Sequence, residues 1–197
     1  MNDFDIIKPP AVLDSILRSS AAIGFELASE RRTGSLLRTL AASKPGGHFL
    51  ELGTGTGVGT AWLLDGMDAG ARLHSVDSDA AVLDVARRHL GSDTRVTFHQ
   101  VDGADFLANT RPAQFDFIFA DAWAGKYMGL DLALGALRPG GIYLIDDLLP
   151  QPNWPEGHAA NVPPLVESLE SRQGFVTTKL AWASGLMMVV RQRLGQV

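Results

Sequence analysis

Three glycines at alternate positions follow directly on a short apolar run, and this pattern constrains the fold more than any other feature of the chain. The run from His48 to Leu52 has the length of a buried strand, and Gly53, Gly55 and Gly57 come next, before a helical pattern over Val58 to Met67. Glycines in such a strand-to-helix turn allow the backbone to approach a ligand closely. The pattern therefore predicts an α/β sheet with a site for a nucleotide-like group where the first strand ends.

Two common glycine-rich loops do not fit these residues. A dinucleotide fingerprint would need a further glycine at Val58, Thr60 or Trp62, depending on the register, and none of these positions is glycine. A phosphate loop would need Gly-Lys followed by Ser or Thr, and the chain lacks that sequence. The glycine spacing of this chain therefore fits neither loop.

Strands and helices alternate after the break at Lys44 to Gly47. Further strands are expected at 72–76, 95–100, 115–120, 142–145, 175–181 and 186–191, and further helices at 79–90, 131–137 and 164–171. Alternation with near-continuous apolar strands predicts a doubly wound, mostly parallel, seven-stranded sheet covered on both faces. Residues 1–45 read as helices, so we expect one domain over 1–197 with a helical N-terminal extension packed on it.

Composition narrows the function further. The 197 residues carry a net charge of −5 without a basic stripe, so a nucleic-acid partner is not expected. Cysteine is absent, which excludes disulfides and thiolate metal sites. The N-terminus lacks the core of a signal peptide, and no apolar run has membrane-spanning length. We expect a cytoplasmic protein without a membrane partner, and a homodimer is left open.

Acidic residues follow the predicted strands at the edge where open α/β sheets bind ligands. Asp77, followed by Ser78, ends the second strand and could accept hydrogen bonds from two ribose hydroxyls. Asp102, Gly103 and Ala104 follow the third strand, although Asp-Gly is also a common turn. These residues are the candidate contacts to the nucleotide-like group.

Three more aspartates are expected to meet at the ends of two neighbouring strands. Asp121 follows the fourth strand, and Asp146 with Asp147 follows the fifth. Adjacent strands lie about 4.8 Å apart, so the carboxylates would repel one another unless a cation lay between them. Oxygen ligands suit Mg²⁺. The alternative is that one aspartate caps a helix while another points to solvent.

The chain resembles the class I S-adenosylmethionine-dependent methyltransferases at its glycine motif. From about Thr33 to Asp147, and again near Gly185 to Arg191, it resembles the cation-dependent O-methyltransferases, the group that contains the catechol and caffeoyl-CoA enzymes. The matching pieces are Gly34-Ser35-Leu36-Leu37, Glu51-Leu52-Gly53-Thr54-Gly55-Thr56-Gly57, Val76-Asp77, Phe115 to Asp121, Leu137 to Gly141 and Leu144 to Asp147. The resemblance implies that the final strand is antiparallel and lies at the end of the sheet.

The resemblance also implies roles for individual residues. Cofactor contacts would come from the glycine motif and the acids that follow the next strands, namely Glu51, Gly53, Thr54, Gly55, Gly57, Asp77, Ser78, Asp102, Gly103, Ala104 and Asp121. Metal ligands would be Asp121, Asp146 and Asp147, where Asp147 replaces the family's usual asparagine. Trp123 and Trp154 lie in predicted rim loops, the second in the proline-rich segment 148–158, and are candidates for the acceptor pocket.

One departure concerns the catalytic base. The family usually has a lysine three residues after the aspartate of the fourth strand, where this chain has Ala124, and Lys126 comes two residues later. Asp121 and Lys126 are the catalytic candidates, and a solvated surface position is the alternative for Lys126.

These observations together predict a methyltransferase that uses S-adenosylmethionine and Mg²⁺, or another divalent cation, to methylate a hydroxyl of a small, phenolic acceptor. A protein of this fold that binds the cofactor without catalysis or without metal is one alternative. A nucleotide-cofactor enzyme of another class is the second.

Overall fold

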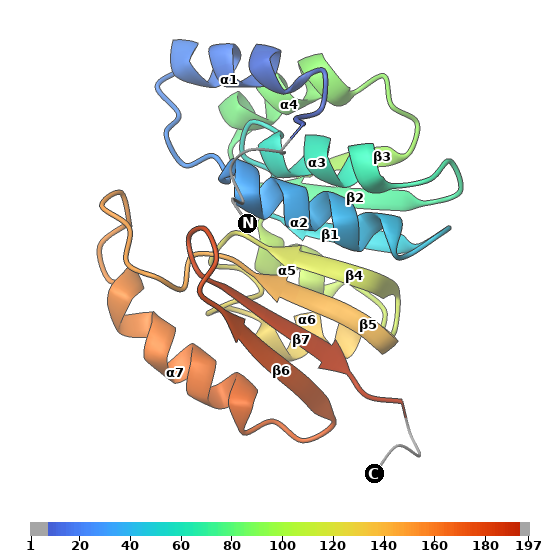
Figure 1. The fold of residues 1–197 in the computed structure, drawn as a ribbon, viewed down its shortest axis with the longest axis vertical. Helices are drawn as coiled ribbons and strands as arrows, with labels where there is room; N and C mark the ends of the chain where they lie inside the picture. Colours follow the sequence, from blue (N-terminus) through green and yellow to red (C-terminus); the bar gives the residue numbers. More distant parts are fainter. Residues whose placement is uncertain (1–7, 194–197) are drawn as a thin grey trace.

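The computed structural model describes residues 8–193, and these form one seven-stranded sheet with helices on both faces (Figure 1). The order of strands in the sheet is β3-β2-β1-β4-β5-β7-β6. The strands are β1 (His48–Leu52), β2 (Arg72–Asp77), β3 (Val96–Gln100), β4 (Phe115–Ala120), β5 (Leu137–Ile145), β6 (Phe175–Leu180) and β7 (Leu186–Arg191). The helices are α1 (Leu13–Ala22), α2 (Arg31–Ala42), α3 (Val58–Gly66), α4 (Ala80–Leu90), α5 (Gly103–Ala108), α6 (Leu130–Ala136) and α7 (His158–Glu170). The doubly wound, mostly parallel fold is confirmed.

The place of the final strand differs from the expectation. Strand β7 is antiparallel, as expected, but it pairs with β5 on one side and with β6 on the other. The edge of the sheet is therefore β6 (Figure 1). The buried positions Leu186, Met187 and Val189 explain this order, because a strand inside the sheet can bury both of its faces.

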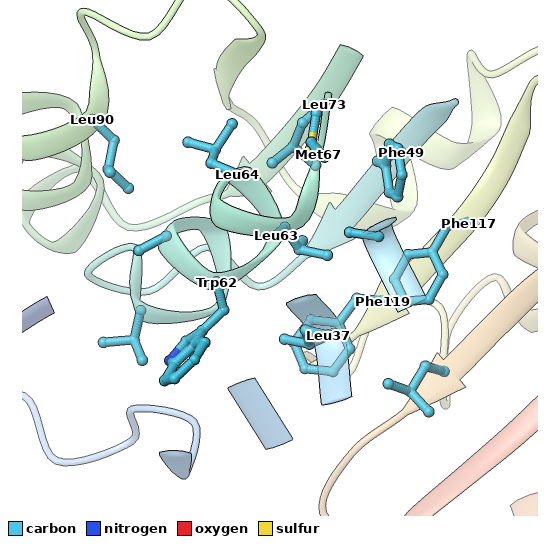
Figure 2. Close-up of a cluster of buried hydrophobic side chains, with 14 of the residues drawn as sticks. Leu37, Phe49, Trp62, Leu63, Leu64, Met67, Leu73, Leu90, Phe117 and Phe119 are labelled. Atoms are coloured by element: carbon cyan, nitrogen blue, oxygen red, sulfur yellow. The ribbon is translucent and has the colours of Figure 1, made fainter. Parts of the chain in front are cut away.

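Apolar side chains alternate between the two faces of the central strands and build two cores. On one face, Phe49, Phe117 and Phe119 pack with residues of α1 to α4, and Figure 2 shows these rings in one cluster with Trp62 and Leu63 of α3. On the other face, the intervening residues of the same strands pack with α5, α6 and α7. The period-two alternation therefore determines which helices cover which face.

Several element boundaries differ from those expected. Asp79 caps α4, which begins at Ala80 instead of residue 79, and its carboxylate accepts a hydrogen bond from the backbone N–H of Ala81 at 2.8 Å. Helix α5 was not expected, and Asp102 caps it by accepting from two backbone N–H groups. Helix α7 begins at His158, before its two internal prolines, instead of near residue 164. Strand β5 begins at Leu137, five residues earlier than expected.

No helix in the described part of the chain, residues 8–193, is long and apolar enough to cross a membrane.

Helices α2 and α3 pack closely because a glycine lies at their contact. A Cβ atom added to Gly34 would lie 2.3 Å from the indole of Trp62, whose side chain is fully buried. The guanidinium of Arg38, one turn further along α2, lies 5.1 Å from the centre of the same ring system. Gly34 thus allows the N-terminal helices to lie against the helix that follows the glycine loop.

We expect Gly34→Ala to lower the free energy of unfolding by about 1–3 kcal/mol, because the added methyl group overpacks the contact with Trp62. The matched control is Gly135→Ala in α6, where an added Cβ meets no atom within 4 Å. The control should be neutral or more stable by up to about 1 kcal/mol, since alanine favours the helix. Urea unfolding curves measure both, and equal effects of the two variants would contradict the packing argument.

A buried carboxyl group joins β1, β2 and α3 beneath the glycine loop. Glu51 has no exposed surface, and its Oε2 accepts hydrogen bonds of 2.5 Å from the hydroxyls of Thr60 and Ser75. Its Oε1 has no hydrogen-bond partner among the described residues. Burial raises the pKa of Glu51 to about 7, the charge of Asp77 adds to the rise, and the two hydroxyls oppose it.

This raised pKa predicts a pH-dependent stability. Below pH 4.5 the Glu51 carboxyl is protonated in both the folded and the unfolded protein. Between pH 4.5 and about 7 only the unfolded chain releases the proton, so the free energy of unfolding falls as the pH rises. From pH 5 to pH 8 the loss should reach about 2–3 kcal/mol. Glu51→Gln, which has nearly the same shape but no charge, should lack this part of the pH dependence.

Urea titrations at pH 5 and pH 8 measure the effect, with Glu167→Gln on the exposed side of α7 as the control. Parallel pH profiles for Glu51→Gln and the wild type would contradict it.

Candidate functional site

The glycine loop lies directly against the end of β4. Gly53 has φ 97°, and a Cβ atom at this position would lie 2.6 Å from the carbonyl oxygen of Asp121. A side chain here would be strained by both conformation and space. The first glycine of the motif therefore brings the loop next to the first residue after β4.

A first cavity, the glycine-loop cavity, lies above this turn. Its walls come from the loop, the end of β2, the segment before α2 and the end of β4, and they include Phe25, Ser29, Gly53, Thr54, Gly55, Thr56, Asp77 and Asp121. The carboxylate of Asp77 accepts hydrogen bonds from the backbone N–H groups of Gly55 at 2.8 Å and Asp79 at 2.9 Å. Asp77 therefore reaches the loop from the neighbouring strand, as expected for a residue of the ligand site.

A second cavity, the Asp102 cavity, continues on the other side of Asp77. Asp77, Ser78, Asp102, Gly103, Trp123 and Ala124 line it, together with the apolar side chains of Leu52, Val76 and Met128. Three residues predicted to contact the cofactor do not line either cavity, namely Glu51, Gly57 and Ala104. Glu51 lies beneath the loop, where it supports the turn.

A third cavity, the Lys126 cavity, lies beyond the ends of β4 and β5 and has a volume of about 290 Å³. Asp121, Asp146 and Asp147 all line it, so the predicted meeting of the three aspartates is observed. Asp147 has φ 63°, a left-handed conformation that is uncommon for aspartate. The remaining wall includes Ser29, Trp123, Lys126, Trp154, His158 and Ser184.

Lys126 points into this acidic cavity. Its side chain is only 2% exposed, and its Nζ donates a hydrogen bond of 2.9 Å to the carbonyl oxygen of Asp146. The same Nζ lies 3.8 Å from Oδ2 of Asp147. The alternative of a solvated surface residue is wrong for Lys126.

The loop between β4 and α6 explains how Lys126 reaches the cavity from two residues beyond the family position. Gly125 has φ 83° and donates a backbone hydrogen bond of 2.7 Å to Met128, and the Tyr143 hydroxyl donates one of 2.5 Å to the Gly125 carbonyl. This tight turn directs Lys126 back toward β5. Ala124, by contrast, lines the Asp102 cavity and is absent from the lining of the Lys126 cavity.

The aspartates of this site share an unusual electrostatic environment. Burial raises the pKa of Asp121 well above its ordinary value, and the charges of Asp146 and Asp147 raise it further, while Lys126 and a hydrogen bond from Ser29 oppose the rise. Burial and the charge of Asp147 raise the pKa of Asp146 to about 6, against the effects of a hydrogen bond from Ser184 and the charge of Lys126. Lys126 is therefore the positive charge that partly balances this cluster.

The expected magnesium site does not fit this arrangement. Among residues 8–193, no group of three acidic, histidine or cysteine side chains is placed to hold a metal ion. Oδ1 of Asp146 already accepts hydrogen bonds from the Ser184 hydroxyl and the Asp147 N–H, and Oδ2 of Asp121 accepts one from Ser29 at 2.9 Å. The ammonium group of Lys126 lies 3.8 Å from Oδ2 of Asp147, where it would repel a second cation.

Aromatic side chains form one wall of the Lys126 cavity. The rings of Trp154 and His158 lie 4.4 Å apart at 36°, and Tyr127 meets both Trp123 and His158 edge to face. His158 Nε2 also lies 3.0 Å from the carbonyl oxygen of Asp147. The two tryptophans predicted for this pocket therefore both line it.

Sequence reasoning missed two residues of the site. Ser29 comes from the segment before α2, and Ser184 comes from the turn between β6 and β7. Neither serine belongs to a motif at a strand end. Only the approach of distant loops in the folded chain brings them to Asp121 and Asp146.

Comparison with known proteins agrees with this architecture. A family model described as a methyltransferase domain matches residues 50–148. A candidate O-methyltransferase of Mycobacterium leprae (strain Br4923) is 29% identical over 120 residues, which make up 59% of this chain and 53% of that protein. The chain thus spans about half the length of the curated relatives it matches.

Solved structures resemble the fold over nearly the whole chain. The O-methyltransferase TomG from Streptomyces achromogenes, involved in tomaymycin synthesis and solved with S-adenosylmethionine, is 23% identical with a TM-score of 0.81, over 96% of this chain and 93% of its own. The O-methyltransferase from Bacillus cereus, solved with S-adenosylhomocysteine, is 22% identical with a TM-score of 0.81, over 95% and 94% of the two chains. These likenesses support the fold, and the matched domain covers half of the sequence, so the chain belongs to the methyltransferase domain family.

Proposed function

We propose that this protein transfers the methyl group of S-adenosylmethionine to a hydroxyl group of a small, phenolic acceptor. The observation that carries the proposal is that the glycine-loop cavity and the Lys126 cavity share Ser29, Asp121 and Ala122. A cofactor in the first cavity and an acceptor in the second would meet at these residues. Such a meeting is the main requirement of a direct transfer, because alignment of the reacting atoms supplies much of the acceleration.

The chemistry of the first two cavities supports S-adenosylmethionine as the cofactor. Asp77 borders both cavities, so a ribose beside it would have its amino-acid tail at the glycine loop and its base in the partly apolar Asp102 cavity. The carboxylate of Asp121 at the far side of the glycine-loop cavity suits a positively charged sulfonium. The two solved relatives that contain this cofactor or its product have the same fold.

The transfer requires one bond to form and one to break. The acceptor oxygen forms a bond to the methyl carbon, the bond from that carbon to sulfur breaks, and its electron pair remains on sulfur, which becomes a neutral thioether. The hydroxyl proton must leave, and the carboxylate of Asp121 at the shared wall is the group we propose to accept it.

The shape of the Lys126 cavity supports a flat aromatic acceptor. Trp123, Trp154 and His158 supply aromatic surface against which a phenol ring can pack. The cavity volume of about 290 Å³ is close to the lower end of the range usual for small-molecule sites. Magnesium, which the resemblance implies, is not part of this proposal, because the carboxylates do not fit a metal ion as they are arranged.

Binding of S-adenosylmethionine should depend on Asp77. We expect Asp77→Ala to weaken affinity for the cofactor and for S-adenosylhomocysteine by about 10- to 150-fold, the equivalent of one hydrogen bond to a charged group. Isothermal titration calorimetry measures this, with Asp84→Ala on the exposed side of α4 as a matched control that should bind normally. A wild-type protein that binds NAD, or that binds neither sulfur compound, would reject the proposed cofactor.

Recognition of the acceptor should depend on Trp154. With catechol and a panel of simple phenols, Trp154→Ala should raise KM by about 10-fold or more, because the ring wall is lost. Trp154→Phe should keep most of the affinity, and both variants should bind S-adenosylmethionine as the wild type does. Unchanged KM and selectivity in Trp154→Ala would show that the proline-rich loop is only a connection.

A further inference from the structure

The Lys126 ammonium group is a buried cation with hydrogen-bonding capacity left over. An ammonium has three N–H donors, and among the described residues the Nζ of Lys126 makes one hydrogen bond, to the carbonyl oxygen of Asp146. The distance of 3.8 Å to Asp147 is an ion pair without a hydrogen bond. Two N–H donors are therefore free to meet an acceptor in the cavity that Lys126 lines.

The surroundings of Lys126 are those that a buried cation needs. A buried ammonium requires opposite charge nearby to offset the loss of hydration. Asp121, Asp146 and Asp147 supply it, since all three carboxylates line the same cavity. The charge of Lys126 in turn lowers the pKa of both Asp121 and Asp146, against the larger opposing effect of burial.

The same surroundings leave no suitable place for a divalent ion. Serine hydroxyls and a backbone N–H already donate to the carboxylate oxygens of Asp121 and Asp146. An incoming Mg²⁺ would compete with these donors for Oδ2 of Asp121 and Oδ1 of Asp146, and the ammonium would repel it. Three aspartates gathered at two strand ends thus have Lys126 as a nearby positive charge.

We propose that Lys126 is the permanent internal cation of this site, which replaces the divalent ion of the enzymes that the chain resembles and donates a hydrogen bond to the acceptor oxygen. This inference rests on the proposed methyl transfer. The ammonium stabilises the negative charge that develops on the oxygen as its proton passes to the Asp121 carboxylate and the carbon–oxygen bond forms. Lys126 keeps its own proton throughout, so it acts as an electrostatic stabiliser and not as a base.

The decisive experiment is a titration of the full chain with Mn²⁺, followed by electron paramagnetic resonance of free and bound ion. The wild type should bind no Mn²⁺ in the cavity. Lys126→Ala, which leaves the three carboxylates without a counterion, should gain one Mn²⁺ site, and Lys126→Arg should not. Lys44→Ala is the matched control. Lys44 also donates a hydrogen bond of 2.9 Å to a backbone carbonyl, that of Gly140, but at the opposite end of the sheet.

Activity supplies a second readout. Transfer of the methyl group to catechol should be unchanged in EDTA, and Lys126→Ala should lower kcat/KM by about 100-fold, the usual effect of removing one such donor. Calorimetry should show unchanged affinity of Lys126→Ala for S-adenosylmethionine.

A wild-type protein that binds Mn²⁺ in stoichiometric amount, or that loses turnover in EDTA, would overturn the inference and leave the proposed function intact. If the wild type transfers no methyl group at all, the proposed function fails, while the Mn²⁺ titration still decides whether Lys126 occupies the place of a metal. That titration of the wild type is decisive even if Lys126→Ala does not fold.

Discussion

The hydrogen bonds of Glu51 are the interaction on which the rest of the site depends. The carboxyl group of Glu51, on β1, is buried under the glycine loop. It accepts hydrogen bonds from the Ser75 hydroxyl on β2 and from the Thr60 hydroxyl on α3, and so holds these elements together around the loop. Thr54 in the loop extends the network through its hydroxyl, which lies 2.6 Å from that of Ser75. The conformation of the glycine loop is thus determined by the hydrogen bonds beneath it, independently of any ligand.

Above this support, a parallel sheet collects polar residues from distant parts of the sequence at one edge. Strands β1, β2, β4 and β5 all end there, and each is followed by a residue that lines a cavity. Gathering so many acids in one place is unfavourable unless some of their charge is offset. Hydroxyl donors and one buried lysine supply that balance, which explains why residues without any motif, such as Ser29 and Ser184, contribute to the site.

The sequence predicted the parts of the fold that depend on local pattern. Strands β1, β4 and β7 have the expected bounds, because apolar periodicity and flanking turns define them without help from elsewhere. Helix α5 was missed because it is only six residues long and Asp102-Gly103 resembles a simple turn. Helix α7 was expected to begin at a proline, but it begins at His158, which is buried and lies 3.0 Å from the carbonyl oxygen of Asp147, just beyond the end of β5.

The site residues that directly follow strand ends could be predicted from the sequence. Those that reach the site only because a loop folds back could not. Asp77 and the three aspartates were found from position alone. The direction of Lys126 depended on a left-handed Gly125 and on the hydrogen bond from Tyr143, neither of which leaves a signal at the spacing of the family lysine. The magnesium expectation did not fit for the same reason, since the position of this one side chain decides which cation balances the acids.

The segment between α1 and α2 connects the two cavities of the proposed site. Leu27, Ala28 and Ser29 form part of the wall of both the glycine-loop cavity and the Lys126 cavity, and Asn153 of the proline-rich loop donates to the carbonyl of Glu26 at 3.3 Å. Because this segment forms part of both walls, a displacement of it would change both cavities at once. Under the proposed function, the cofactor site and the acceptor site would therefore open together.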